Sequence, residues 1–426
     1  MKLLKAICIV CICALLASCN SVPDNTASSS SKSESTEISS SESSKSSSSC
    51  GENTEKIIVE GSYLEHLYKK DIKSINCHNA TAAAILNDGS AVFWGSNVYG
   101  GIGNGSIDLD LPHGEKAMPT PPYRFCFGEP VVAAGSQVCS YALTESGTLY
   151  MWGMNNTYRA GLEGDPILVP TKITSVTDIK QVSTSTEFTL ALKGDGTVYH
   201  TGTRMELFKN SHDYDWRSLE SEQDKTFTKM SLDFKCKKID TSGLSYVFLS
   251  DKGDVYIQGI LFADINAENP DLVFKAPTKI DFPEKIVDIA ALAINVVALS
   301  ETGNVYVFGC PGAGASDKKI DICISDLIYQ KNLENIKGIS GNCFTVGALS
   351  ENGEIYVWGI DEHGVIKESN VNLQRGQLEI VPEPVKLDYQ NIIQFCIGIY
   401  DGTAISENGD VYIWGSNSIG QIIEFE

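Results

Sequence analysis

The amino-acid sequence predicts an all-β protein, a closed seven-bladed β-propeller that occupies residues 56–426. Three observations lead to this prediction. A phrase of eight residues recurs seven times, every copy has glycine at its second and eighth positions, and the residues between are mostly apolar on both faces of a strand. A segment of this length exceeds what one hydrophobic core usually holds, and repetition of a small unit resolves the difficulty.

The repeated phrase is regular enough to count the blades. The second-position glycines are separated by 58, 49, 57, 50, 50 and 56 residues. The copies begin at Asp88, Ser146, Asp195, Lys252, Thr302, Asn352 and Asn408. The glycines that we expect to be structural are Gly89, Gly95, Gly147, Gly153, Gly196, Gly202, Gly253, Gly259, Gly303, Gly309, Gly353, Gly359, Gly409 and Gly415.

Each phrase is typical of the second arm of a β-hairpin. Its opening Asn-Gly or Asp-Gly type of pair tolerates the positive φ of a tight turn, and an apolar run such as 82–86 precedes it. In the second copy, Leu149 and Met151 lie on one face of the predicted strand, and Tyr150 and Trp152 on the other. A sheet with one wet face would alternate apolar and polar residues. These strands must therefore be buried on both sides, which radial stacking of blades achieves.

Closure of the ring removes exposed sheet edges, and it requires the two ends of the chain to meet. The last phrase is followed only by residues 416–426. We therefore expect the strand-like residues 56–60 (KIIVE) to complete a blade shared with the C-terminus. Helical solenoids are excluded, because the phrase has strand periodicity and is rich in β-branched and aromatic residues.

The continuation of the phrase resembles a known repeat. The first copy continues through Trp94 to Gly103 (WGSNVYGGIG), and the last through Trp414 to Ile422 (WGSNSIGQI). These runs resemble the Trp-Gly-x-Asn-x-x-Gly-Gln-Leu-Gly pattern of the regulator-of-chromosome-condensation repeat, whose members form seven-bladed propellers. The third and fourth copies depart from it, with Thr201 and Gln258 where tryptophan is usual. The resemblance implies recognition of proteins across one propeller face. It also implies nucleotide exchange on a small GTPase and docking on chromatin for the family's namesake, which do not suit an exported protein.

The N-terminal residues predict export and lipid anchoring. Lys2 and Lys5 precede the apolar run 6–16, whose 11 residues fall short of the ~20 that span a bilayer. The run ends in Leu-Ala-Ser-Cys, which resembles a bacterial lipobox with Cys19 as the lipidated residue. We therefore assign 1–18 to a signal peptide, and expect the cell membrane to hold the protein on its extracytoplasmic face through the lipid alone.

Residues 19–55 are expected to form a tether between this anchor and the propeller. Residues 20–49 contain 16 serines and almost no large apolar side chains, so they cannot offset their ordering entropy. A flexible chain of this length reaches roughly 30 Å, which holds a folded domain clear of a membrane surface.

The net charge argues against one class of partner, and the cysteine spacing argues against metal and redox motifs. Without Lys2 and Lys5, 31 basic residues face 54 acidic ones, a formal charge of −23, and no basic cluster stands out. This composition argues against nucleic acid as a partner. Nine cysteines follow Cys19, an odd number without metal-ligand or redox spacing. Those within apolar runs, such as Cys139 and Cys396, are expected to be small buried side chains.

The sequence offers no catalytic constellation, so we predict no catalytic residue, no metal and no cofactor. The six histidines show no metal-ligand spacing, and the turn acids, such as Asp88 and Glu351, are local to hairpins. Asp108 and Asp110 could bind calcium weakly, but no further ligands follow at loop spacing.

Binding residues are expected in the longer connections between phrases. Three connections are enlarged, at 96–130, 203–235 and 360–384. Tyrosine, tryptophan and arginine dominate interface energetics. The candidate contact residues are therefore Tyr214, Trp216, Arg217, Tyr99, Tyr123 and Arg124, although local packing on the rim would explain them equally well.

Together these features predict a monomeric, lipid-anchored binding module that recognises a surface protein, or a glycan, through propeller loops. The alternative is a propeller enzyme, a lyase or glycosidase acting on an extracellular polysaccharide. A structural spacer within a surface assembly is a third interpretation. The partner, the face used, the disulfide pairing and the number of host membranes stay open at this point.

Overall fold

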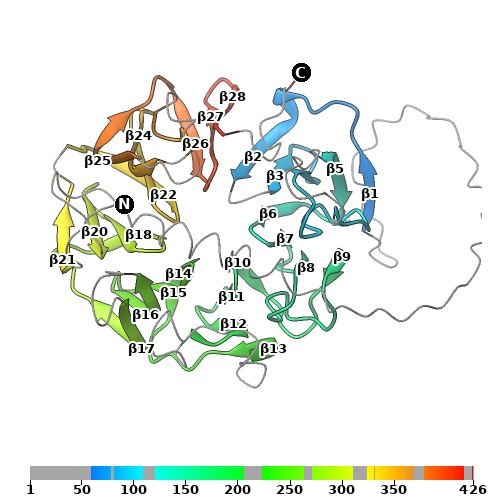
Figure 1. Cartoon of the computed structure of the whole chain (residues 1–426), viewed down its shortest axis with the longest axis horizontal. Coiled ribbons are helices and arrows are strands. Elements are labelled where there is room, and N and C mark those ends of the chain that lie inside the picture. Colours follow the sequence, from blue (N-terminus) through cyan, green and yellow to red (C-terminus); the bar gives the residue numbers. More distant parts are fainter. Residues whose placement is uncertain are drawn as a thin grey trace, which may run out of the picture.

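The computed structural model describes residues 59–77, 81–108, 120–205, 223–262, 271–309, 324–330, 332–361, 363–367, 379–416 and 425. Within them, seven antiparallel β-sheets surround a central axis (Figure 1). The prediction of an all-β, seven-bladed propeller is confirmed. In the described residues, no helix is long and apolar enough to cross a membrane.

Each blade is built from successive strands, ordered from the axis outward. The innermost strands are β2 (Ile72–Cys77), β6 (Val131–Ser136), β10 (Ile179–Thr184), β14 (Cys236–Ser242), β18 (Ile286–Ala291), β22 (Ile336–Asn342) and β26 (Ile392–Ile397). The second strands are β3 (Thr81–Leu86), β7 (Cys139–Thr144), β11 (Phe188–Lys193), β15 (Leu244–Ser250), β19 (Asn295–Ser300), β23 (Thr345–Ser350) and β27 (Asp401–Ser406).

The repeated phrase supplies the third strand of every blade. The third strands are β4 (Ala91–Gly95), β8 (Leu149–Gly153), β12 (Val198–Thr203), β16 (Val255–Phe262), β20 (Val305–Gly309), β24 (Ile355–Asp361) and β28 (Val411–Gly415). The outer strands are β5 (Thr120–Cys126), β9 (Ile167–Lys172), β13 (Gln223–Lys229), β17 (Asp271–Ile280), β21 (Ile324–Tyr329) and β25 (Glu379–Lys386). One further strand, β1 (Glu60–Tyr63), and a 3-10 turn, η1 (Lys69–Asp71), precede β2.

The two glycines of the phrase have different physical roles. The second-position glycines, such as Gly89 with φ 84°, adopt the left-handed backbone that the hairpin turn requires. The last glycine also has positive φ, 119° at Gly359, and there the second strand crowds it as well. A Cβ on Gly359 would lie 2.2 Å from the carbonyl oxygen of Phe344. The crowding of the two backbones therefore explains why glycine ends the phrase.

A β-bulge recurs in every innermost strand. In all seven blades the register with the second strand shifts after the first residue of the innermost strand, as between Ile286 and Asp288. The extra residue places the first and fourth positions on the same side. In β18 these positions are Ile286 and Ile289, both buried in the core between the fourth and fifth blades. The bulge therefore lets each innermost strand pack against the preceding blade.

The expected route of ring closure is wrong, although the ring does close. Strand β1 pairs with β5, with Glu60 opposite Cys126, and so extends the first blade rather than the last. The outer edge of β5 offers free backbone groups, and Val59 packs on the core between the first two blades. Residues 56–58 of the expected strand lie outside the described residues.

Closure is instead made by side chains of the first and last blades. Ile75 and Trp94 share a buried cluster with Ile405 and Val411. Phe425 packs edge-on against Trp94, with ring centroids 6.4 Å apart. The N- and C-terminal strands therefore meet by packing rather than by sharing one sheet.

Cysteines that the sequence places in apolar runs are buried, as predicted, at Cys139, Cys343 and Cys396. Cys236 is buried as well, and Cys126 is half-buried. Burial raises the pKa of Cys139 to about 12, so this thiol stays protonated.

Candidate functional site

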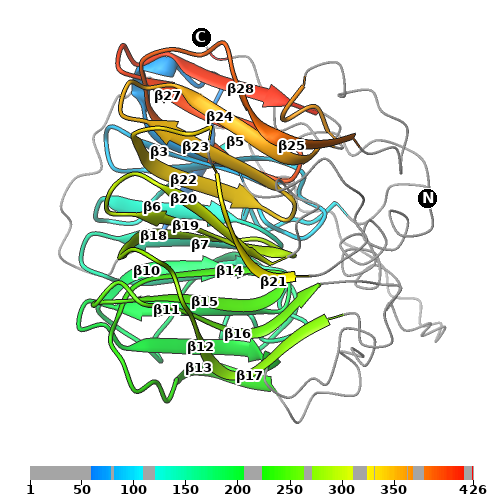
Figure 2. The ribbon, with the colours of Figure 1, turned by 90° about the vertical axis from the view of Figure 1, so that its left-hand side faces the viewer.

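The propeller has two faces, which are distinguished by the direction of the strands. Connections from the third to the outer strand leave from one end of the blades, which we call the loop face. Turns between the second and third strands lie at the other end, which we call the turn face. In Figure 2 the strands run from one face to the other. All three enlarged connections join a third strand to an outer strand, so their described ends lie at the loop face.

The asparagine of the repeat fixes the base of these connections. In the first connection, Asn97 Oδ1 accepts a hydrogen bond from Ile102 N at 3.1 Å, and its Nδ2 donates to Ser106 O at 3.0 Å. Asn155 plays the same part in the second blade, accepting from Ala160 N at 2.8 Å and donating to Leu162 O at 2.7 Å.

The sixth blade keeps the same device with an aspartate. The Asp361 carboxylate can only accept hydrogen bonds, and it accepts them from Val365 N at 3.0 Å and from Lys367 N at 2.8 Å. The start of the enlarged connection 360–384 is therefore held by the carboxylate side chain.

The tryptophan of the phrase joins neighbouring blades at this face. Trp152 Nε1 of the second blade donates to Gly101 O of the first blade at 2.8 Å. Trp414 Nε1 of the seventh blade donates to Val365 O of the sixth at 2.9 Å. Thr201, which replaces tryptophan in the third blade, donates to Tyr158 O at 2.8 Å.

A polar network joins the described ends of the second enlarged connection, 203–235. His200 Nδ1 lies 2.9 Å from Asp224 Oδ2, and Arg204 donates to Asp224 Oδ1 at 2.8 Å. On the other side of the imidazole, the Tyr246 hydroxyl lies 3.0 Å from His200 Nε2. Burial alone would raise the pKa of Asp224, but hydrogen bonds from His200 and Arg204 outweigh it and lower that pKa. His200 lies in β12, Arg204 follows that strand and Asp224 lies in β13, so the network ties the two strands together where the loop between them begins and ends.

The predicted contact residues are not gathered in the described structure. Tyr214, Trp216 and Arg217 lie outside the described residues. Tyr99 is half-buried at the loop face. Whether these residues contact a partner therefore stays a prediction.

The last two predicted contact residues belong to the outer strand β5. Tyr123 packs edge-on against Tyr63, with ring centroids 4.8 Å apart. The Arg124 guanidinium pairs with Asp88 and donates to Ser90 Oγ at 2.9 Å. Arg124 thus ties β5 to a hairpin of the turn face, which is the local packing that the sequence left open.

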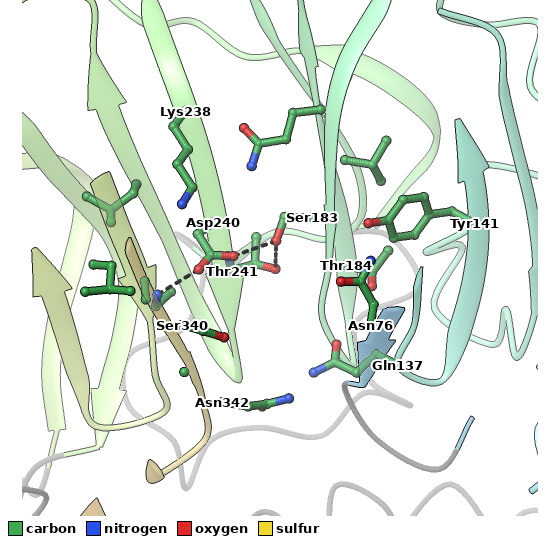
Figure 3. A pocket seen from close by; sticks show the side chains of 17 residues that line it. Asn76, Gln137, Tyr141, Ser183, Thr184, Lys238, Asp240, Thr241, Ser340 and Asn342 are labelled. Carbon is green, nitrogen blue, oxygen red and sulfur yellow. Dashed lines mark hydrogen bonds between the residues drawn. The ribbon is translucent and has the colours of Figure 1, made fainter. Parts of the chain in front are cut away.

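A polar channel of about 310 Å³ runs between the innermost strands (Figure 3). Residues from six blades line it, and most of its polar side chains bridge neighbouring blades. Gln181 donates to Ile239 O at 2.7 Å and accepts from Ile239 N at 3.0 Å, as a peptide group of a sheet would. Ser340 Oγ accepts from Ile397 N at 2.9 Å.

The acid at the centre of the channel is also used structurally. Asp240 Oδ1 accepts from Ser183 Oγ at 3.0 Å and from Thr241 N at 2.9 Å, and Oδ2 accepts from Ala291 N at 2.9 Å. Burial raises the pKa of Asp240, while nearby Lys238 and these donors oppose the rise. Asp240 therefore links the third, fourth and fifth blades. Within the described part of the chain, no group of three or more His, Cys, Asp or Glu side chains could hold a metal.

Carboxylates organise the turn face in a similar way. Glu284 precedes the fifth blade and accepts hydrogen bonds from Thr302, Asn304 and Tyr306 of that blade's hairpin. These hydrogen bonds, from Thr302 first, lower the pKa of Glu284 to about 2. Glu129 accepts from Thr144 and Ser146 in the second blade.

Comparison with known proteins agrees with this geometry. Residues 146–192 match the family model described as regulator of chromosome condensation (RCC1) repeat. This chain therefore carries an RCC1 repeat. The matched segment runs from the turn before β8 to strand β11, and so joins the second and third blades.

Two human relatives match part of the chain. The probable E3 ubiquitin-protein ligase HERC3 is 30% identical over 156 residues, which are 35% of this chain and 14% of that protein. The E3 ubiquitin-protein ligase HERC2 is 30% identical over 141 residues, 31% of this chain and 3% of that protein. The chain thus spans a small part of the relatives it matches.

Solved structures share the fold over most of the chain. Human WBSCR16 superposes with a TM-score of 0.61 and 17% identity, covering 78% of this chain and 89% of that one. Prp20p from Saccharomyces cerevisiae, described with its binding properties to Gsp1p and histones, gives 0.58 at 17% identity, covering 83% and 85%. The yeast RCC1 (Prp20) structure with Kap60 gives 0.59 at 16%, covering 91% and 87%. At these identities the likeness shows the propeller fold alone.

Proposed function

We propose that this chain is a lipid-anchored, extracytoplasmic module that binds a protein partner through the loop face of its propeller. The observation that carries the proposal is the construction of that face. The enlarged connections leave from one end of the third strands, and their bases are fixed by Asn97, by Asp361 and by the His200–Asp224–Arg204 network. Binding segments held by a rigid scaffold are the common arrangement of recognition proteins.

The relatives and the channel support binding rather than turnover. The yeast protein Prp20, also called yeast RCC1, shares this fold and is described in two structures with Gsp1p and histones and with Kap60. In the channel, Asp240 accepts three hydrogen bonds that join blades, and Gln181 is engaged with Ile239 in both directions. Such side chains serve the scaffold, whereas a catalytic acid needs a free position beside its substrate.

The location rests on the N-terminal sequence. The apolar run 6–16 with Cys19 after it supports lipidation, and the serine-rich stretch supports a tether. Replacing Cys19 by serine removes the thiol that would carry the lipid, so Cys19→Ser should move the protein from the membrane to the soluble fraction. Retention of the variant in the membrane fraction would remove the anchoring part of the proposal.

The binding part is tested by capture of a partner with the full chain, solubilised from membranes. The wild-type chain should retain one surface protein in near-stoichiometric amount. The variant Tyr214→Ala/Trp216→Ala/Arg217→Ala should lose at least about tenfold of it, because such side chains dominate interface energies. The control Tyr329→Ala, on an exposed tyrosine of the outer strand β21 near the turn face, should retain the partner.

Two results would contradict loop-face recognition. Equal capture by the triple variant would exclude these residues as the contact. Turnover of a purified extracellular polysaccharide by the wild-type chain would favour the enzyme alternative.

A further inference from the structure

The turn face carries a ring of lysines that the repeat itself generates. The bulge in each innermost strand makes the second residue of that strand the extra one, outside the regular pairing. That position is Lys73 in β2, Lys180 in β10, Lys237 in β14 and Lys337 in β22, and all four lysines are exposed. We call them the ring lysines.

Strand geometry places the ring lysines around the mouth of the channel. The innermost strands surround the axis (Figure 1), and their first residues pair beside the hairpin turns, as Ile72 does with Leu86. The turn residue Asn87 is in turn bonded to the backbone just before β2, through Asn87 N and Asp71 O at 2.8 Å. Equivalent positions in different blades therefore form one circle on the turn face.

The ring lysines differ from other lysines of the same face. Lys193 pairs with Asp178 at 3.3 Å and Lys285 pairs with Glu301 at 3.6 Å. In the part of the chain that the structure describes, Lys73, Lys180 and Lys237 have no carboxylate within 4.0 Å. Among the described residues, Lys337 has no carboxylate within 4.0 Å either, and its Nζ donates to the backbone oxygen of Glu351 at 3.5 Å.

Some carboxylates of this face are already used within the fold. Glu284 and Glu129 accept hydrogen bonds from hairpins, and Asp88 pairs with Arg124. Others, such as Glu145 and Glu407, are exposed acids of the hairpin turns. The ring lysines are therefore the ammonium groups on this face that a ligand's carboxylates can pair with, in a chain whose formal charge is −21.

Two exposed aliphatic side chains hold the same position in two further blades, and the half-buried Val287 holds it in β18. Val132 is 49% exposed and Ile393 is 58% exposed, and they hold the same second position in β6 and β26. They rank among the few large apolar side chains exposed in the described residues. Aliphatic groups between lysines suit a partner that is acidic and apolar together, whereas a purely polar polyanion would leave them unused.

We propose that this ring binds an acidic protein segment in which carboxylate and aliphatic side chains alternate. Its carboxylates pair with the ring lysines, and its aliphatic side chains cover Val132 and Ile393. This surface lies on the face opposite to the one proposed above for the main partner, and it neither depends on that contact nor replaces it.

The test measures binding of a fluorescent octapeptide of alternating Glu and Val to the full chain by anisotropy. The variant Lys73→Ala/Lys180→Ala/Lys237→Ala should weaken binding at least about tenfold, and salt should weaken binding to the wild type, because exposed charge pairs are screened. The charge-matched control Lys193→Ala/Lys235→Ala/Lys285→Ala removes three lysines that pair with acids of this face. It should bind within about twofold of the wild type.

Several outcomes overturn the proposal. Equal losses in both triple variants would reduce the effect to net charge. No binding by the wild type, or equally tight binding of inorganic polyphosphate or of anionic phospholipid vesicles, would exclude an acidic protein segment as the ligand. Capture of the loop-face partner should be unchanged in the ring variant, so the two proposals fail separately.

Discussion

Two tryptophans at equivalent positions show how neighbouring blades are joined. Trp152 and Trp358 both occupy the seventh position of the phrase and are both 0% exposed. Trp152 Nε1 donates to Gly101 O of the preceding blade at 2.8 Å. Within the described residues, Trp358 Nε1 has no hydrogen-bond partner.

The two preceding blades differ in sequence after the phrase. The first blade continues with the full motif through Gly103, whereas the fifth has Pro311 where the motif has asparagine. Residues 310–323 of the fifth blade lie outside the described residues. Among the described residues, Trp152 therefore both packs and donates a hydrogen bond between blades, whereas Trp358 contributes buried packing.

The largest loss of stability is expected from a substitution that crowds the Trp152 indole between the first and second blades. Gly103 has φ 79°, and a Cβ there would lie 2.6 Å from Trp152 Nε1. Gly103→Ala should therefore lower the free energy of unfolding by about 2–4 kcal/mol, from backbone strain and overpacking together.

The matched control for that variant lies two residues away. Gly105 has φ 87° but open space around its Cβ, so Gly105→Ala should cost only the backbone strain, about 1 kcal/mol. Urea denaturation of both variants measures the difference. Equal losses would show that the indole does not press on the glycine.

A smaller effect isolates the hydrogen bond itself. Trp152→Phe and Trp358→Phe remove similar buried volume, but among the described residues only the first removes an interblade hydrogen bond. The first should be more destabilising by about 1–2 kcal/mol, the cost of losing a buried hydrogen bond. Denaturation midpoints under one set of conditions measure this difference, and a larger loss at Trp358 would reverse the interpretation of the two sites.

The sequence was sufficient for the blades because their signals are local. Gly89 and Gly95 lie within one phrase, and the positive φ of both follows from a hairpin turn and a crowded strand end. The seven copies then gave the number of blades. Closure was predicted with the wrong strand, because the choice of β1 between two sheet edges depends on Val59 packing against distant residues.

The candidate site was less predictable, because its parts lie far apart in the chain. Asp240 accepts from Ser183 and Ala291, both more than 50 residues away, and its strand gives no motif that distinguishes it from a solvated acid. The ring lysines are also far apart in the chain, so the sequence showed no basic cluster. The sole signal was the recurrence of lysine at the second residue of four of the seven innermost strands, and this becomes visible only when the bulges are known.

The central claim is that the ring closes between its first and last blades as firmly as elsewhere, and one pair of variants tests it most directly. Ile75 and Ile289 hold the same position in β2 and β18, are 1% and 0% exposed, and face the closing seam and an interior interface respectively. The measurement is the free energy of unfolding of Ile75→Ala and Ile289→Ala. For a closed ring both should fall by about 2–5 kcal/mol, the usual range for a buried isoleucine. A loss at Ile289 with less than about 1 kcal/mol at Ile75 would show a seam without a packed core and would contradict the closed propeller.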